Sequence, residues 1–166
     1  MQNLKNPLIF VVEDNKVYNK LIVNFLKSNK FTNVEAFHTG EDCLKNIDKC
    51  PNIIIQDYLL EGMNGIEVLK RVKKVNPETE FIFLSGQDSM DVAINTMKYG
   101  AFDYIVKDQM TLEKMVNKVK QIMSVSSLKS SKRNYKLGII IFFIVLFLLV
   151  LFIILFFFTE MFGVNK

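Results

Sequence analysis

Cysteine and histidine are scarce in this sequence, which has two cysteines and one histidine among its 166 residues. Two cysteines are too few for a disulfide framework, and the C-x6-C spacing of Cys43 and Cys50 does not match a zinc-binding pattern. With a single histidine, His38, a His/Cys metal centre lacks ligands. These absences favour a protein of a reducing, cytosolic compartment.

Motifs of several common function classes are also missing. The sequence has no glycine-rich phosphate loop, no Ser-His-Asp set, no Cys-His set and no DNA-reading module. The net charge of +4 does not indicate a nucleic-acid partner, because residues 1–124 hold 16 basic and 16 acidic side chains. The basic excess lies in residues 125–136, at Lys129, Lys132, Arg133 and Lys136.

Apolar residues are abundant near the end of the chain. Residues 137–158 read LGIIIFFIVLFLLVLFIILFFF, without one polar side chain. At about 1.5 Å per residue, a helix of this length measures about 33 Å, enough to cross a hydrocarbon core of about 30 Å. A buried core helix of this length would carry some polar positions, so we predict a transmembrane helix in contact with membrane lipid.

The flanking residues predict the orientation of this helix. Four basic side chains precede the span, and the positive-inside tendency then keeps residues 1–124 in the cytoplasm, at the cytoplasmic (inner) membrane. The apolar run Leu8–Val12 is too short for a signal peptide. We therefore expect a cytosolic domain at 1–124, a basic linker at 125–136, a single membrane span at 137–158 and a short tail at 159–166.

Short apolar runs alternate with longer amphipathic stretches through residues 1–124. The expected strands are Leu8–Val12, Val34–Phe37, Ile53–Ile55, Phe81–Leu84 and Tyr104–Val106. The expected helices are Asn15–Ser28, a helix beginning near Thr39 and ending before Pro51, Ile66–Val75, Ser89–Met97, and Thr111 to about Met123. This alternation predicts an α/β fold, with a parallel sheet covered by helices on both faces.

The same reading makes two finer predictions about the helices. Asp14, Asp88 and Thr111 are expected to cap the first, fourth and fifth helices. The first helix is expected to carry a helically spaced apolar set, formed by Val17, Leu21, Ile22, Phe25 and Leu26.

Polar side chains follow four of the five expected strands. They are Glu13 and Asp14, Asp57, Ser85, and Lys107. Taken singly, an acid there is usually a helix cap, a serine a turn residue and a lysine a solvated side chain. Because ligands of such sheets bind beyond the carboxyl ends of the strands, their coincidence predicts one site.

The chemistry of this set points to a metal ion and a phosphoryl group. Neighbouring strands lie about 4.8 Å apart, so three carboxylates at this edge raise each other's pKa unless a cation is present. An all-oxygen set favours Mg²⁺. Asp57 is the candidate nucleophile for phosphorus, and Ser85 and Lys107 can approach the phosphoryl oxygens. This prediction requires Asp57 to lie within about 8 Å of Asp14, the span of one shared ion.

Four sequence runs carry a family resemblance. VVEDN at 11–15, IIIQDYLLEGMNG at 53–65, FLSG at 83–86 and YIVKD at 104–108 together resemble the receiver domain of bacterial two-component response regulators, over residues 7 to about 124. The resemblance implies a flavodoxin-like sheet of five parallel strands in the order 2-1-3-4-5.

The resemblance also implies a role for each matching position. Asp57 resembles the phosphoacceptor, which takes a phosphoryl group from a histidine kinase. For Mg²⁺, Asp14 resembles the direct ligand, Glu13 its partner acting partly through water, and the carbonyl of Leu59 the remaining protein ligand. For the phosphoryl group and the switch, the matching positions are the hydroxyl of Ser85, the amine of Lys107 and the aromatic ring of Tyr104.

Two positions depart from the family pattern. The family usually has proline after the lysine, with a cis bond before it, and here Asp108 follows Lys107. A cis bond without proline costs about 2.5–4 kcal/mol, so we expect a trans bond and a displaced Lys107. Glu61 stands where Leu-Pro is common, which is expected to loosen the loop after Asp57.

These observations support a membrane-anchored receiver that is phosphorylated on Asp57 with Mg²⁺ and signals by partner binding. Its expected partners are a histidine kinase or phosphotransfer protein and a downstream protein, with no nucleic acid. It would be a signalling domain rather than an enzyme. The alternative is a phosphorylation-independent membrane adaptor that retains the fold. An aspartyl phosphatase is disfavoured, because Asp57-Tyr58-Leu59 lacks the second acid of a D-x-D pattern.

Overall fold

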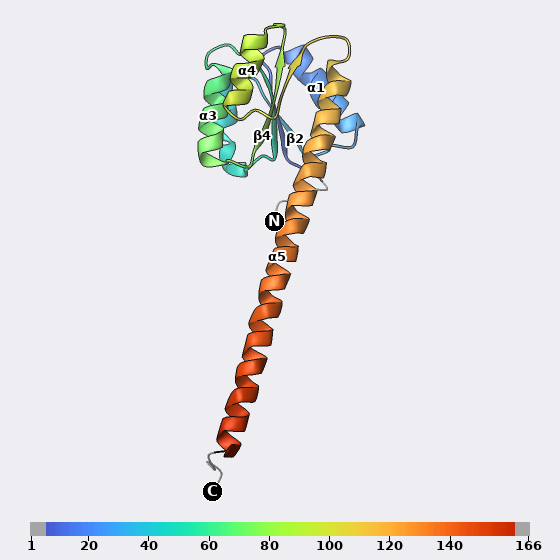
Figure 1. Ribbon diagram of the computed structural model, residues 1–166. Helices are drawn as coiled ribbons and strands as arrows, with labels where there is room; N and C mark the ends of the chain where they lie inside the picture. Colours follow the sequence, from blue (N-terminus) through green and yellow to red (C-terminus); the bar gives the residue numbers. More distant parts are fainter. Residues whose placement is uncertain (1–5, 162–166) are drawn as a thin grey trace. The chain divides into compact units, whose positions relative to one another are not determined.

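The computed structural model describes residues 6–161, with the side chains of 127–138, 157 and 159–161 left out of the description (Figure 1). The chain divides into two compact units, residues 1–124 and residues 125–166. The first unit holds a five-stranded parallel sheet. Its strands are β1 Ile9–Val12, β2 Val34–Phe37, β3 Ile53–Asp57, β4 Glu80–Ser85 and β5 Asp103–Val106.

The strand order is β2-β1-β3-β4-β5, and every neighbouring pair is parallel. This confirms the predicted fold class and the order 2-1-3-4-5. Each strand is followed by a helix, as the alternation of the sequence predicted. The helices are α1 Lys16–Ser28, α2 Gly40–Lys45 with the short 3₁₀ helix η1 Ile47–Lys49, α3 Gly65–Val75, α4 Met90–Lys98 and α5 Thr111–Met161.

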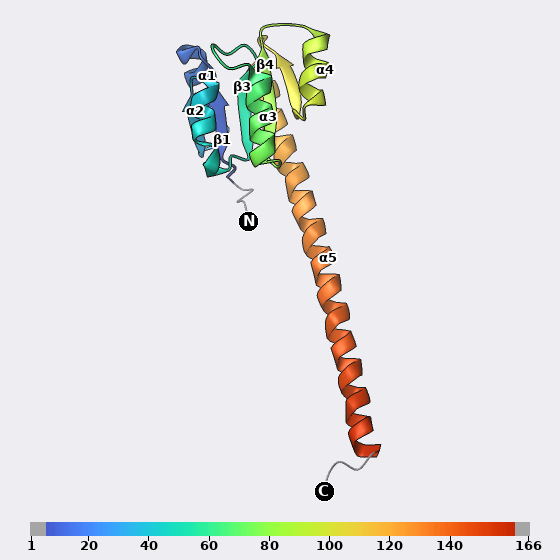
Figure 2. The same ribbon diagram turned by 90° about the vertical axis from the view of Figure 1, so that its left-hand side faces the viewer.

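The sheet has a hydrophobic core on each face. Successive side chains of β1 point to opposite faces, so Ile9 and Val11 join one core and Phe10 and Val12 the other. Helix α1 and the part of α5 within residues 111–124 cover the first core, and α2 and α3 cover the second (Figure 1). Figure 2 looks onto the face covered by α2 and α3. Burial on both faces explains why the central strands are almost continuously apolar.

The predicted cap of α1 is wrong. Asn15, not Asp14, is the N-cap, and its Oδ1 accepts hydrogen bonds from the N–H groups of Val17 and Tyr18, both at 3.0 Å. The carboxylate of Asp14 instead accepts a hydrogen bond from the N–H of Glu61 at 3.3 Å. Because Asn15 accepts the hydrogen bonds of the N–H groups in the first turn, Asp14 is not needed as a cap and can lie at the end of the sheet.

Two further cap predictions are also wrong. Ser89 caps α4 in place of Asp88, with its Oγ 3.5 Å from the N–H of Val92. Thr111 is the first residue of α5, and its hydroxyl accepts from the N–H of Asp108 at 2.6 Å. Aspartate and serine can both cap a helix, so residue type alone does not choose between Asp88 and Ser89.

The face that α1 presents to the core also differs from the expected set. Ile22 and Leu26 are buried, but Val17 and Leu21 are 81% and 47% exposed. Asn19 is buried in their place, and its amide donates to the carbonyl oxygens of Glu13 at 3.0 Å and Phe37 at 2.8 Å. The buried amide is tolerated because its nitrogen donates to both of these carbonyls, which lie just after β1 and at the end of β2.

Helix α5 continues beyond its expected end near Met123 and reaches Met161. Residues 125–136 contain neither proline nor glycine, so nothing in that segment forces the helix to stop. Within the first unit, α5 buries Met115, Val116, Val119 and Ile122. The charged side chains of the expected linker lie outside the described residues.

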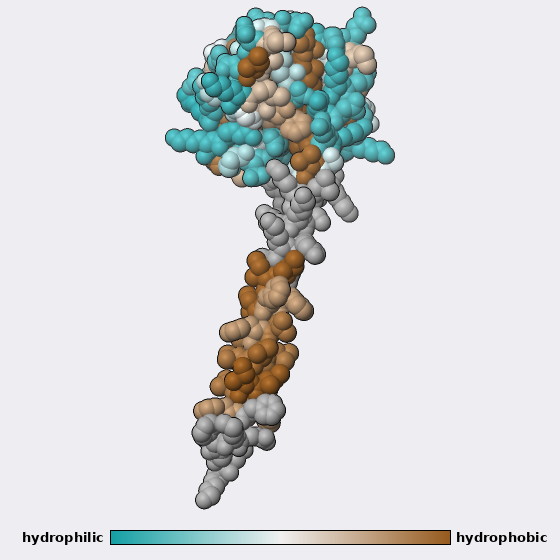
Figure 3. Space-filling view, viewed as in Figure 1, coloured by the Kyte–Doolittle hydropathy of each residue, from teal (hydrophilic) through white to brown (hydrophobic). Residues whose placement is uncertain are grey.

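The second unit contains a long apolar helical stretch. Among the described residues, Ile139–Phe156 is the one segment long and apolar enough to cross a membrane, and none of it is buried. Figure 3 shows its hydrophobic side chains as a continuous apolar surface. The tail expected at 159–166 lies mostly outside the described residues.

The start of α3 lies in close contact with side chains of β3 and β4. Gln56 is fully buried, and neither polar atom of its amide has a hydrogen-bond partner among the described residues. A Cβ placed on Gly65 would lie 2.6 Å from the Gln56 Nε2 and 3.0 Å from a ring carbon of Phe83. Only a residue without a side chain allows α3 to begin this close to the sheet.

We predict that Gly65→Ala destabilises the first unit by about 1–3 kcal/mol, because the added methyl group overpacks the core. Urea denaturation of the full chain in detergent, followed by circular dichroism, measures the change. Gly86→Ala is the matched control, since nothing lies within 4 Å of the Cβ position there. Equal free energies of unfolding for the two variants would contradict the close packing at Gly65.

Candidate functional site

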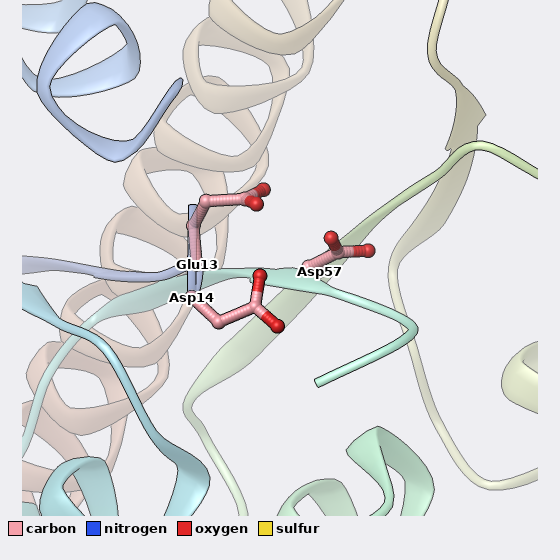
Figure 4. Close-up of side chains that lie close together, drawn as sticks. All are labelled: Glu13, Asp14 and Asp57. Atoms are coloured by element: carbon pink, nitrogen blue, oxygen red, sulfur yellow. The ribbon is translucent and has the colours of Figure 1, made fainter. Parts of the chain in front are cut away.

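Three carboxylates converge at the carboxyl edge of the sheet. Glu13 and Asp14 follow β1, and Asp57 is the last residue of β3, which pairs with β1 in parallel register. One oxygen from each carboxylate lies within 4.8 Å of the others (Figure 4). Asp57 therefore lies well within the predicted 8 Å limit of Asp14. Glu13 and Asp57 are buried, which leaves their charges poorly solvated.

Lys107 supplies the positive charge of this cluster. Its Nζ lies 2.7 Å from the Asp57 Oδ2 and 2.9 Å from the Glu13 Oε2. Its backbone N–H donates to the carbonyl of Ser85 at 2.7 Å, which ties the end of β5 to the end of β4. The ammonium group thus contacts a carboxylate that is 94 positions away in the sequence and a second one that is 50 positions away.

The expected displacement of Lys107 is wrong. The bond between Lys107 and Asp108 is trans, yet the ammonium reaches both carboxylates. A hydrogen-bonded turn follows the lysine. In that turn the N–H of Asp108 donates to the Thr111 hydroxyl, and the Asp108 carboxylate accepts from the N–H of Met110 and pairs with Lys114. These bonds give the turn a defined shape without proline.

Burial and charge shift the pKa values of the cluster. Burial raises the pKa of Glu13, and the charge of Asp57 raises it further, against the opposing hydrogen bond and charge of Lys107. For Lys107, burial acts to lower the pKa, but its hydrogen bonds to Asp57 and Glu13 and their charges outweigh burial. The net pKa of Lys107 is raised, so this lysine is charged at neutral pH.

The loop after β3 closes over the acids. The N–H of Leu59 donates to the Asp57 Oδ1 at 3.2 Å, and the N–H of Glu61 donates to the Asp14 Oδ2 at 3.3 Å. Leu59, the predicted source of a carbonyl ligand, is therefore adjacent to the cluster. Glu61, where the loop was expected to be loose, contributes a backbone contact to it.

Ser85 and Tyr104 do not contact the carboxylates in this arrangement. The buried Ser85 Oγ accepts from the N–H of Gln87 at 3.0 Å. The Tyr104 hydroxyl donates to the carbonyl of the same residue at 2.7 Å, and its ring packs edge-on against Tyr58, with ring centroids 6.2 Å apart. The structure therefore joins the two predicted switch residues to one residue of the β4–α4 loop, Gln87, through its N–H and its carbonyl.

The geometry fits a small divalent cation. Octahedral Mg²⁺ holds oxygen ligands at about 2.1 Å, which places opposite ligands about 4.2 Å apart. The carboxylate oxygens of Glu13, Asp14 and Asp57, all within 4.8 Å of one another, are close to that spacing. Asp57 additionally touches an ammonium group, an arrangement that can meet the charge of a phosphoryl group on the same carboxylate.

Sequence reasoning missed two residues near the site. Asn19 fastens the ends of β1 and β2, and a polar residue in register with Ile22 and Leu26 was the available signal. Tyr18 places its ring against Lys107, with the ammonium nitrogen 4.8 Å from the ring centroid. No local pattern signals this contact, because it joins α1 to the end of β5.

The comparisons with known proteins agree with this site. The family model of the response regulator receiver domain matches residues 9–120. The transcriptional regulatory protein CssR of Bacillus subtilis is 29% identical over 117 residues, covering 70% of this chain and 52% of that protein. TrcR of Mycobacterium tuberculosis, also a transcriptional regulatory protein, is 28% identical over 120 residues, covering 72% of this chain and 46% of that protein. The chain thus spans about half the length of these curated relatives.

Solved receiver structures share the fold. A BeF3-activated DrrB receiver domain is 27% identical, with a TM-score of 0.66, and the match covers 72% of this chain and 98% of that one. The signal receiver domain of a LuxO repressor protein from Vibrio parahaemolyticus is 25% identical, with a TM-score of 0.69. That match covers 75% of this chain and 95% of the other. With its family match, its strand order and its cluster of acids and lysine, the chain belongs to the response regulator receiver domain family.

Proposed function

We propose that this chain is a membrane-anchored phosphoacceptor of a two-component phosphorelay. It accepts a phosphoryl group on Asp57 in the presence of Mg²⁺ and signals by binding a protein partner. The observation that carries this proposal is the contact between the Lys107 ammonium and the Asp57 carboxylate inside the acidic cluster. Receiver domains are signalling domains rather than classical enzymes, and they interact with histidine kinases or phosphotransfer proteins.

The phosphoryl donor in this proposal is a phosphohistidine. An oxygen of Asp57 forms a bond to phosphorus while the bond from phosphorus to the imidazole nitrogen breaks, and that nitrogen keeps the electron pair. Mg²⁺, held by Asp14, Asp57 and the carbonyl of Leu59 with Glu13 acting partly through water, would neutralise the carboxylates and the phosphoryl oxygens. Lys107 meets the remaining negative charge, since its ammonium already contacts Asp57.

The phosphoryl group adds about two negative charges and three acceptor oxygens beside Ser85 and Tyr104. The Ser85 Oγ accepts from the N–H of Gln87 in this structure, and a hydroxyl can accept one hydrogen bond while donating another, so a move of Ser85 toward such an oxygen would draw Gln87 with it. We propose that Tyr104 follows, because its hydroxyl is bound to the same residue. The surface of α4 and β5 then changes, which is a route to partner recognition.

The membrane anchor of this proposal is the apolar segment of residues 137–158. Its described part is helical and long enough to span a bilayer. The basic residues that precede it in the sequence favour a receiver on the cytoplasmic side of the inner membrane. Anchoring would confine the receiver near membrane-bound kinases and raise its effective concentration there.

The first prediction concerns the phosphoacceptor. Incubation of the full chain with acetyl phosphate and Mg²⁺ should add one phosphoryl group, and Asp57→Asn should abolish the addition because the amide is a poor nucleophile. Intact-mass spectrometry measures the product, with Asp48→Asn on the exposed η1 helix as the control. Modification of the Asp57→Asn protein would refute the assignment. A wild-type chain that neither acetyl phosphate nor phosphorylated kinases modify would support the phosphorylation-independent adaptor.

The second prediction concerns the metal. At tenfold its dissociation constant, Mg²⁺ should stabilise the receiver unit by about 1.4 kcal/mol, because it binds only the folded state. Asp14→Ala should remove this stabilisation, whereas Asp48→Asn should keep it. Thermal unfolding of the full chain in detergent, with and without MgCl₂, gives the comparison. An Asp14→Ala protein that responds to Mg²⁺ like the wild type would place the ion elsewhere.

The third prediction concerns the anchor. Arginine at the centre of a membrane helix costs about 2.5–3.5 kcal/mol, so the double variant Leu146→Arg, Leu149→Arg should leave the membrane fraction. The wild type and the matched Leu146→Ala, Leu149→Ala variant should remain in the membrane pellet after alkaline extraction. Quantitative blotting of the fractions measures the distribution. Release of the wild type by alkali would contradict a transmembrane anchor.

A further inference from the structure

The ring of Tyr18 closes one side of the Lys107 environment. The ammonium nitrogen lies 4.8 Å from the Tyr18 ring centroid, within the range of a cation–π contact. The same nitrogen donates hydrogen bonds to the carboxylates of Asp57 and Glu13. Lys107 therefore has two charged neighbours, the carboxylates, whose attraction for the ammonium weakens when they bind a metal ion. Its third neighbour, the Tyr18 ring, is neutral, and its attraction for the ammonium does not depend on metal binding.

The position of Tyr18 is itself fixed by the first turn of α1. Its backbone N–H donates to the side chain of Asn15 at 3.0 Å, and its side chain packs against the core that α1 shares with α5. Burial raises the pKa of its phenol above the ordinary value, although the charge of Lys107 opposes that shift. The phenol is therefore neutral at physiological pH, and the ring presents an uncharged face to the ammonium.

We propose that Tyr18 is a positioning residue, which holds the Lys107 ammonium beside Asp57 through a cation–π contact when the carboxylates are engaged elsewhere. This inference rests on the proposed phosphoacceptor function. A divalent cation on the carboxylates competes with the ammonium for the same oxygens, because like charges repel at this distance. A neutral ring takes no part in that competition. The contact keeps the amine within reach of an incoming phosphoryl oxygen.

The turn after Lys107 makes this role specific to the chain. Asp108 and Thr111 fix the backbone of the turn by hydrogen bonds, but none of these bonds reaches the Lys107 side chain. Among the contacts described for that side chain, the Tyr18 ring is the one that carries no charge. The aromatic ring, rather than the phenol hydroxyl, is the group that matters for Lys107.

The direct test observes Lys107 in the unphosphorylated protein, first without metal and then with saturating Mg²⁺ on the carboxylates. In the full chain labelled with [13Cε]lysine and held in detergent micelles, the Hε signal of Lys107 should be shifted upfield by the ring current of Tyr18. The signal is assigned by its loss in Lys107→Arg. Tyr18→Phe should keep the upfield shift, and Tyr18→Leu or Tyr18→Met should return the signal to the range of the other lysines. An unchanged Lys107 signal in both non-aromatic variants overturns the proposal.

The functional arm measures phosphorylation by acetyl phosphate in the same variants. Loss of the cation–π contact should slow phosphorylation about fivefold in Tyr18→Leu, whereas Tyr18→Phe should stay within about twofold of the wild type. In a Lys107→Arg background, the Tyr18→Phe variant should again be phosphorylated faster than the Tyr18→Leu variant, because a guanidinium group also binds aromatic rings. Equal slowing of the Phe and Leu variants overturns the proposal. If the wild type is not phosphorylated at all, the phosphoacceptor function fails, while the Lys107 signal still tests the contact.

Discussion

The ion pairs of Lys107 with Asp57 and Glu13 are the interaction on which the rest of the site depends. Two buried carboxylates side by side are costly, and a single ammonium at 2.7 and 2.9 Å offsets part of that cost. The amine can reach both acids because β1 and β3 are paired in parallel and β5 is fastened to β4 by the Lys107 N–H. The pairing of the strands in the sheet thus brings charged side chains from distant parts of the chain together.

The fold was predictable because the three central strands, β1, β3 and β4, are buried on both faces and the helices between the strands have one apolar side. The site was predictable at the level of strand ends, since Glu13, Asp14, Asp57 and Lys107 all follow apolar runs and do gather at one edge. The sequence could not decide which of two neighbouring residues caps a helix when both residue types are able to do so. Both Asp14 and Asn15 can cap a helix, and only the carboxylate cluster and the Glu61 N–H explain why the asparagine takes that role.

Long-range contacts account for the remaining differences. Asn19 replaces part of the expected apolar face of α1, and its buried amide donates to the carbonyls of Glu13 and Phe37. The trans bond at Asp108 was predictable from the absence of proline, but the position of the Lys107 side chain was not. That position follows from the carboxylates themselves and from Tyr18, which are brought together only in the folded chain.

The register between β1 and β3 has a consequence for how such a chain can vary. Val12 pairs with Gln56, so the acids after β1 stand beside Asp57, while the buried Gln56 amide has no hydrogen-bond partner within the described part of the chain. Side chains alternate along a strand, so inserting or deleting one residue within β3 would turn Asp57 to the opposite face and bring Gln56 or Tyr58 toward the acids. A change in the length of this strand therefore removes the site even when every residue type of the site is still present in the sequence.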